Sequence, residues 1–379
     1  MRLPHILGLS VALHLYIGAR IIPAMAGAGP AALLALLLAA SALFVPVGMF
    51  SRQLAKPPVS DTLAWAGLPF LGLFSSLFVL TVLRDALLVL AWILSLLTPA
   101  VMLDDVRTAT AAAVPLLALA ATFIGFLNAR RTAQVKTVEI VLAGLPAPLQ
   151  GFTIVQISDV HVGPTIRARH VQAIVETVNR LKPDLVAITG DLVDGSVAEL
   201  GAQVAPMSRL VSRHGSYFVT GNHEYYSGVH PWLVELDRLG IRVLLNEHVV
   251  IERDGARLVL AGVPDYSAAH FDPAHRSDAR AALAGAPPDA MKVLLAHQPR
   301  SAPAAALAGF DLQLSGHTHG GQFLPWRFFV QFQQPFTAGL HKVGKMWVYV
   351  SRGTGYWGPP KRFGAPSEIT RLRLVAAPT

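Results

Sequence analysis

The chain has 379 residues, of which 53% are hydrophobic and only 14% are charged. Soluble domains carry about 25% charged residues, so this composition argues against a single soluble globule. The absence of cysteine excludes disulfides, thiolate zinc sites, iron–sulfur clusters and thiol nucleophiles. The net charge of +8 suits an anionic membrane surface or substrate. No dense run of Lys and Arg with interleaved aromatic residues occurs, so we expect no nucleic acid partner.

Charged residues are scarce in the first third of the chain. Up to residue 128 there are six basic and four acidic residues. A membrane-spanning helix needs roughly 20 mainly apolar residues, and four stretches meet this requirement: 3–22, 30–50, 62–97 and 108–127. The third contains Arg84 and Asp85, so it is either one long helix or two helices that meet there. We predict a membrane domain of about four transmembrane helices over residues 1–130, with the lipid bilayer as a partner.

The basic residues between these stretches predict an orientation. With four spans, six basic residues lie on one side and two on the other: Arg2, Arg52, Lys56, Arg130, Arg131 and Lys136 against Arg20 and Arg107. By the positive-inside rule, the following domain would face the cytoplasm of a multi-pass inner (cytoplasmic) membrane protein. A fifth span through residues 86–103 would reverse this orientation. A signal peptide is the alternative for the first stretch, but the apolar sequence continues into further spans.

The pattern changes after residue 130. We expect a linker and a first strand over 131–149, and a domain over 150–379 in which short apolar strands alternate with helices. The predicted strands cover 152–157, 185–189, 217–220, 293–296 and 312–315. A helix is predicted over 168–181, where apolar residues recur on one face. This alternation indicates an α/β fold, and by itself it is equally compatible with a doubly wound sheet.

Polar residues follow each of these five strands, usually beside Gly. Because strand ends along one sheet edge converge, the polar side chains can share a site. The candidates are Asp159, His161, Asp191, Asn222, His297, His317 and His319. Oxygen and nitrogen donors without sulfur suit Mn, Fe or Zn, and seven donors exceed the need of one four-coordinate zinc. They suffice for two divalent ions bridged by a carboxylate, the arrangement that produces a metal-activated hydroxide for attack at phosphorus.

Five sequence blocks resemble the calcineurin-like metallophosphoesterase family over about residues 150–375. In chain order they are Asp159-x-His161, Gly190-Asp191, Gly221-Asn222-His223-Glu224, His297 and Gly316-His317-x-His319. The resemblance implies a four-layer α/β/β/α sandwich of two mixed sheets with helices outside.

The same resemblance implies roles for individual residues. Asp159, His161 and His319 would bind one ion, Asn222, His297 and His317 would bind the other, and Asp191 would bridge the two. His223 would be the acid that protonates the leaving oxygen or stabilises the phosphoryl charge. Asp194 and Glu224 would orient the ligands rather than bind metal.

A narrower resemblance concerns residues 190–195, 221–226 and 353–368, which are similar to membrane-attached bacterial members of the YkuE and YaeI type. It implies hydrolysis of a phosphodiester or pyrophosphate bond in a lipid-linked substrate, such as UDP-2,3-diacylglucosamine in lipid A biosynthesis. Three alternatives stay open: a membrane-tethered phosphatase or phosphodiesterase of soluble nucleotides or phosphoproteins, a metal-binding sensor without turnover, and a transporter with a regulatory domain. The sequence does not define the oligomeric state.

Two further features have more than one interpretation. Residues 323–332 are unusually aromatic, and they either pack in the core or form a membrane-facing lip. Most histidines outside the five blocks are expected to be ordinary surface or core residues. They are His170, His214, His230, His248, His270, His275 and His341.

Overall fold

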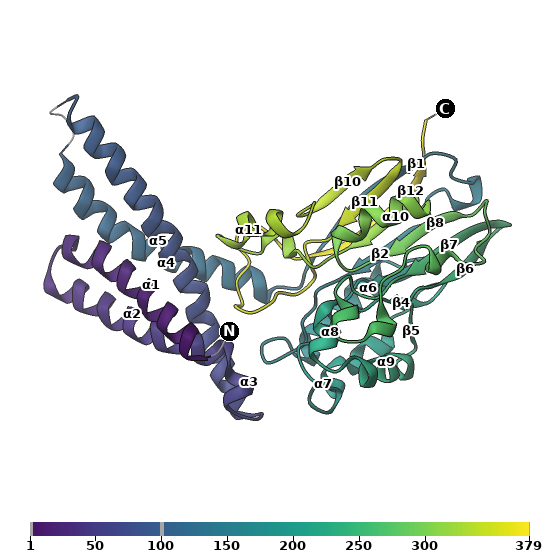
Figure 1. The fold of residues 1–379 in the computed structure, drawn as a ribbon, viewed down its shortest axis with the longest axis horizontal. Coiled ribbons are helices and arrows are strands. Elements are labelled where there is room, and N and C mark those ends of the chain that lie inside the picture. Colours follow the sequence, from purple (N-terminus) through teal and green to yellow (C-terminus); the bar gives the residue numbers. More distant parts are fainter. Residues whose placement is uncertain (1–2, 99–101, 379) are drawn as a thin grey trace. The chain divides into compact units, whose positions relative to one another are not determined.

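The computed structural model describes residues 3–98 and 102–378, and the chain forms two compact units (Figure 1). The first unit contains the chain up to residue 130 together with residues 323–325 and 358–363. The second contains residues 131–322, 326–357 and the chain from residue 364 onward.

The first unit is helical. Within the described residues, four of its helices are long and apolar enough to cross a membrane, which confirms the predicted four apolar helices. The helices of this unit are α1 (Leu3–Ile21), α2 (Ala28–Met49), the short α3 (Ser51–Leu54), α4 (Val59–Ser95) and α5 (Leu103–Arg130). Arg84 and Asp85 lie inside α4, so the third apolar stretch is one continuous helix. Its 37 residues extend for about 55 Å, more than the hydrocarbon core requires.

Apolar side chains and close glycine contacts hold the helical unit together. Its buried cluster includes Ile17 from α1, Leu34 from α2 and Leu77 from α4. Gly48 and Gly67 bring α2 and α4 together so closely that a Cβ at Gly48 would lie 2.7 Å from the Gly67 backbone. Small residues that let backbones approach are typical of helix pairs in membranes.

The charged pair in α4 is satisfied within the same unit. The Arg84 guanidinium donates hydrogen bonds to Thr110 Oγ1 and to the backbone carbonyls of Arg20 and Arg107, at 2.9 to 3.1 Å. Asp85 accepts hydrogen bonds from the Arg20 side chain at 2.9 Å and from the Tyr16 hydroxyl at 2.7 Å. Because polar groups in a bilayer need partners, these bonds explain how one apolar helix accommodates both charges.

The second unit contains two mixed six-stranded sheets (Figure 1). The first sheet has the order β1 (Gln134–Leu142), β12 (Glu368–Ala376), β2 (Thr153–Ile157), β3 (Leu185–Ile188), β4 (Ser216–Phe218) and β5 (Ile241–Val243). The second has the order β10 (Gly339–Val343), β11 (Met346–Val350), β9 (Leu312–Ser315), β8 (Met291–Leu295), β7 (Ala256–Gly262) and β6 (Glu247–Arg253). Strands β2 to β5 run parallel to one another, as do β7, β8, β9 and β11.

The two sheets share one hydrophobic core. Ile154 and Leu185 from the first sheet are buried in the same cluster as Leu260 and Leu314 from the second. Helices lie outside this pair: α6 (Ala168–Arg180), α7 (Val197–Val204), α8 (Asn222–Tyr226), α9 (Val229–Arg238), α10 (Ala302–Ala308) and α11 (Trp326–Gln333). The four-layer α/β/β/α prediction is therefore confirmed. The five predicted strands and the helix at α6 are present, with ends that differ by no more than two residues.

The aromatic segment differs from a core segment. Residues 326–333 form α11, and every residue of this helix is at least partly exposed. Trp326, Phe328, Phe329 and Phe332 are each at least half exposed. Of the two interpretations, core packing is wrong for the helix, although Phe323 just before it is buried.

Candidate metal centre

The predicted site residues lie at the carboxyl ends of parallel strands. Asp159 follows β2, Asp191 follows β3 and Asn222 follows β4 in the first sheet. His297 follows β8, and His317 and His319 follow β9 in the second sheet. Because both sheets contribute strand ends, side chains separated by more than 150 residues become neighbours.

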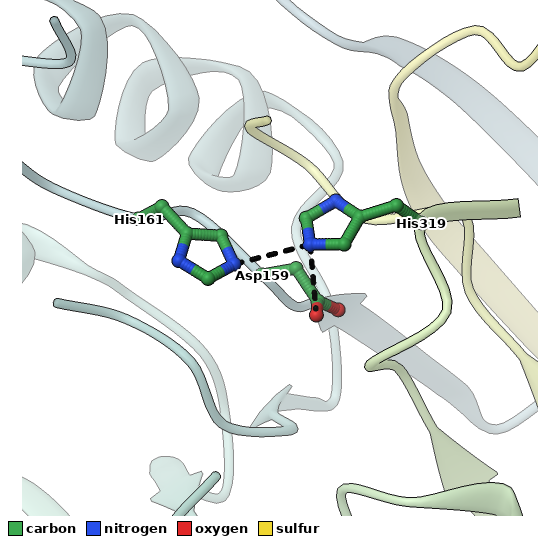
Figure 2. A group of neighbouring side chains, drawn as sticks. All are labelled: Asp159, His161 and His319. Atoms are coloured by element: carbon green, nitrogen blue, oxygen red, sulfur yellow. Dashed lines mark hydrogen bonds and ion pairs between the residues drawn. The ribbon is translucent and has the colours of Figure 1, made fainter. Parts of the chain in front are cut away.

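The first group consists of Asp159, His161 and His319 (Figure 2). The rings of His161 and His319 face each other with their Nε2 atoms 3.1 Å apart. His319 Nε2 also lies 3.5 Å from Asp159 Oδ1. One candidate donor atom from each residue lies within 4.8 Å of the others, so the three can share one cation.

The second group consists of Asp191, His297 and His317. His297 Nε2 lies 3.2 Å from His317 Nδ1 and 3.0 Å from Asp191 Oδ2. The other nitrogen of His297, Nδ1, is 2.7 Å from the Thr189 carbonyl, which leaves Nε2 facing the group. Burial and the neighbouring His297 lower the pKa of His317 to about 3, so its ring is neutral at pH 7 and can offer a lone pair.

Asp191 faces both groups. Its Oδ2 lies 3.0 Å from His297 Nε2 in the second group and 3.8 Å from His161 Nε2 in the first. Its Oδ1 accepts a hydrogen bond from the His223 backbone N–H at 2.9 Å. This geometry leaves one carboxylate oxygen directed between the groups, which is the position that a bridging ligand needs.

Asn222 is the seventh predicted ligand. It begins α8, next to His223, and its side chain is buried. Within the described part of the chain, its Oδ1 has no hydrogen-bond partner. A buried carbonyl oxygen without a partner is costly, and a cation would satisfy it.

The distances between the ligand nitrogens and the backbone conformations of the ligands also support a metal site. In both groups, imidazole nitrogens face each other at hydrogen-bond distance, as expected for ligands that share an ion. Five of the seven predicted ligands adopt left-handed backbone conformations, with φ between 51° and 71°: Asp159, His161, Asp191, His317 and His319. Such strain in non-glycine residues concentrates at functional sites.

Two glycines allow the ligands to come this close. A Cβ at Gly221 would collide with Asp191 Oδ1, and a Cβ at Gly316 would collide with Asp159 Oδ2. The glycines beside the polar residues therefore provide space for the ligands.

Asp194 connects the predicted acid to the first group. Its Oδ1 lies 2.7 Å from His223 Nδ1 and 3.0 Å from His161 Nδ1. Burial works against a charged ring, but the carboxylates of Asp191 and Asp194 outweigh it and raise the pKa of His223 to about 9. Burial likewise opposes ionisation of Asp194, yet the rings of His161 and His223 hold its pKa well below the usual range. His223 is therefore positively charged at neutral pH and held in one orientation.

Glu224 organises the loops that carry the ligands. Its buried carboxyl group accepts hydrogen bonds from the backbone N–H groups of Asp191 at 3.0 Å, Leu192 at 2.7 Å and Gly221 at 2.7 Å. These contacts join the segment after β3 to the segment after β4. The expectation that Glu224 orients ligands agrees with this position.

Two aromatic side chains lie beside His223, a position that the sequence analysis did not assign to them. The ring centroids of Tyr226 and Trp357 lie 5.2 and 5.7 Å from that of His223, and both side chains are at least half exposed. Both residues belong to sequence segments that carry the narrower resemblance, but their exposure beside His223 depends on the fold.

Comparison with known proteins identifies phosphoesterases as relatives of this chain. A family profile described as calcineurin-like phosphoesterase matches residues 152–321. The transmembrane protein with metallophosphoesterase domain of Bos taurus is 44% identical over 267 residues, which cover 67% of this chain and 60% of that protein. An uncharacterized metallophosphoesterase of Helicobacter pylori is 40% identical over 256 residues, which cover 66% of each chain.

A third relative is the uncharacterized metallophosphoesterase YkuE of Bacillus subtilis, with 30% identity over 240 residues, 61% of this chain and 81% of the relative. The chain spans only 60% of the length of the bovine relative, and the relatives include animal proteins as well as bacterial ones. The apolar helices and the transmembrane relatives together support membrane association. The chain belongs to the calcineurin-like metallophosphoesterases, a family of metal-dependent hydrolases that act on phosphoester bonds.

Proposed function

We propose that this protein is a membrane-embedded phosphohydrolase with two divalent metal ions, and that it cleaves a phosphodiester or pyrophosphate bond in a lipid-linked substrate resembling UDP-2,3-diacylglucosamine. The observation that carries the hydrolytic part is the pair of adjacent donor groups, with Asp191 directed toward both.

The residues divide between the two ions as follows. Asp159, His161 and His319 would hold one ion, Asn222, His297 and His317 would hold the other, and Asp191 would contribute to both. The nitrogen and oxygen donors suit Mn, Fe or Zn. Ions bound there supply positive charge that polarises the phosphoryl group and lowers the pKa of attacking water.

The chain itself contributes a positioned proton. Asp194 accepts the hydrogen bond from Nδ1 of His223. The other ring nitrogen, Nε2, therefore faces the metal centre and lies 4.0 Å from Asp191 Oδ2. With a pKa of about 9, the ring keeps the proton on Nε2 at neutral pH. His223 can therefore protonate the leaving oxygen as the bond to phosphorus breaks.

Exposed aromatic residues support a lipid-linked substrate. Helix α11 begins seven residues after His319 and exposes four aromatic side chains. Exposed aromatic residues in an amphipathic helix favour the membrane interface. Since this helix follows a proposed ligand closely in the chain, a substrate anchored in the bilayer would be close to the metal centre.

The proposed location is the inner (cytoplasmic) membrane, with the catalytic domain on the cytoplasmic side. Six basic residues near the span ends on one side against two on the other support this orientation. The single continuous α4 supports four spans rather than five.

The test uses the full chain purified in detergent, stripped with a chelator and reloaded with Mn²⁺. Hydrolysis of bis-p-nitrophenyl phosphate is compared with hydrolysis of UDP-diacylglucosamine in mixed micelles, and Asp191→Asn serves as the inactive control. We expect metal-dependent hydrolysis of both, with strong preference for the lipid.

Two other results have clear meanings. Activity on the soluble diester alone would keep the metal chemistry and reduce the helices to a tether for soluble nucleotide or phosphoprotein substrates. Absence of hydrolysis of both substrates by the fully metal-loaded chain would contradict the proposed substrate class and leave the metal centre without an identified substrate.

A further inference from the structure

A third group of metal-ligating side chains lies outside the catalytic centre. It consists of His230 in α9, of Asp272, which caps the short 3-10 helix Pro273–His275, and of His275, which ends that helix. His230 Nε2 lies 3.2 Å from Asp272 Oδ2, and His275 Nε2 lies 3.9 Å from the same oxygen. One donor atom from each residue lies within 4.8 Å of the others.

Neighbouring hydrogen bonds direct these donors inward. Asp272 Oδ1 accepts the Ala274 backbone N–H at 2.9 Å, which leaves Oδ2 for the two rings. The Tyr225 hydroxyl lies 2.9 Å from His275 Nδ1, so that the Nε2 of this ring faces Asp272. A hydrogen bond to the outer nitrogen of a histidine is the usual support for a metal-ligating ring.

We propose that His230, Asp272 and His275 form a binding site for one divalent transition-metal ion, for which Zn²⁺ is the reference probe. Ligand atoms around a tetrahedral zinc at 2.0–2.2 Å lie about 3.4 Å apart. The separation of 3.2 Å meets this requirement, and the separation of 3.9 Å requires a small movement of a ring. The His230 side chain is 68% exposed, so it is free to move and leaves the fourth position open to water.

The position of this site gives it a structural consequence. Tyr225, which contacts His275, belongs to the same short helix α8 as Asn222 and His223. Its hydroxyl also lies 3.2 Å from Thr220 Oγ1 in the loop before that helix. An ion at this peripheral site would join α9 to the 3-10 helix Pro273–His275, which contacts the segment that carries the proposed catalytic acid through Tyr225.

The experiment measures metal content rather than activity. Full-length chain carrying Asp191→Asn, which we expect to empty the catalytic centre, is stripped with a chelator, equilibrated with Zn²⁺ and desalted. Elemental analysis should then find about one zinc per chain. Adding His230→Ala should remove this zinc, and because His230 is largely exposed, the variant should fold. His270→Ala, an exposed histidine two residues before Asp272, is the matched control and should retain the ion.

A second measurement tests the orientation of the ligands. Tyr225→Phe should keep the stoichiometry but weaken zinc binding about 10–100-fold, because His275 loses its outer hydrogen bond. Equal zinc content with and without His230→Ala would overturn the proposal. The same holds if His270→Ala loses as much zinc as His230→Ala, because zinc would then bind to surface histidines in general. If Asp191→Asn retains ions in the catalytic centre, the bridging assignment fails. The change in zinc content caused by His230→Ala still tests the peripheral site.

Discussion

Replacing Asp194 with Asn tests how the Asp194 carboxylate keeps the His223 ring protonated. Asp194 Oδ1 lies at hydrogen-bond distance from His223 Nδ1, and its side chain is only 24% exposed. A hydrogen bond between charged groups contributes about 1.5–3 kcal/mol, which corresponds to roughly 1–2 pH units at 1.36 kcal/mol per unit. Asp194→Asn removes the negative charge that helps to raise the pKa of His223 to about 9.

The sign of the effect follows from the active protonation state. The acid acts in its protonated form, so activity is present below the pKa of His223 and is lost as pH rises through it. Lowering this pKa should move the alkaline decline in kcat/KM to lower pH by about 1–2 units. At pH 7 the protonated fraction of His223 should fall by at most about half, because the lowered pKa is still about 7–8, so most of the loss should appear above neutral pH.

The assay is a pH–rate profile at saturating Mn²⁺. Asp194 also contacts His161, so the variant is expected to bind metal about 10–100-fold more weakly, and excess metal separates the two effects. An alkyl phosphodiester with a poor leaving group is compared with bis-p-nitrophenyl phosphate, which needs less help from an acid. The exposed Asp237→Asn serves as the control. An unchanged alkaline decline for the alkyl diester would refute the reasoning.

Three further variants test other parts of the centre. Asp191→Asn should lose both ions and nearly all activity, and unchanged metal content by elemental analysis would contradict its bridging role. His223→Ala should keep both ions but slow hydrolysis about 10²–10⁴-fold; an equal loss on substrates with good and poor leaving groups would argue against an acid. Glu224→Gln turns an amide toward two backbone donors and should destabilise the chain by about 2–6 kcal/mol, so an unchanged melting temperature in detergent would show that these hydrogen bonds are dispensable.

The sequence alone predicted the elements that local patterns encode. Uncharged runs of about 20 residues indicate helices for a bilayer, and four such helices are present. Polar residues directly after apolar strands predicted a shared site, because parallel strands bring their carboxyl ends to one edge. The structure brings six of the seven predicted ligands into two adjacent groups and leaves Asn222 Oδ1 buried beside His223.

Only the tertiary structure determined which residues meet across long distances in the chain. That one oxygen of Asp194 contacts both His161 and His223 depends on how the loops after β2, β3 and β4 pack, and no local pattern encodes this packing. The same holds for His230 and His275, which were expected to be ordinary residues and which the fold brings to Asp272.

The sequence also left open whether the aromatic segment is buried, because burial depends on packing between distant segments. The sequence of residues 323–332 was compatible with core packing or with a membrane-facing lip, because an aromatic side chain fits either environment, and the fold exposes the aromatic residues of α11. Continuity of α4 through Arg84 also required partners on other helices, namely Thr110 and the carbonyls of Arg20 and Arg107. Periodicity and motif spacing define segments and their chemistry, whereas contacts between segments arise from packing, which depends on the whole chain.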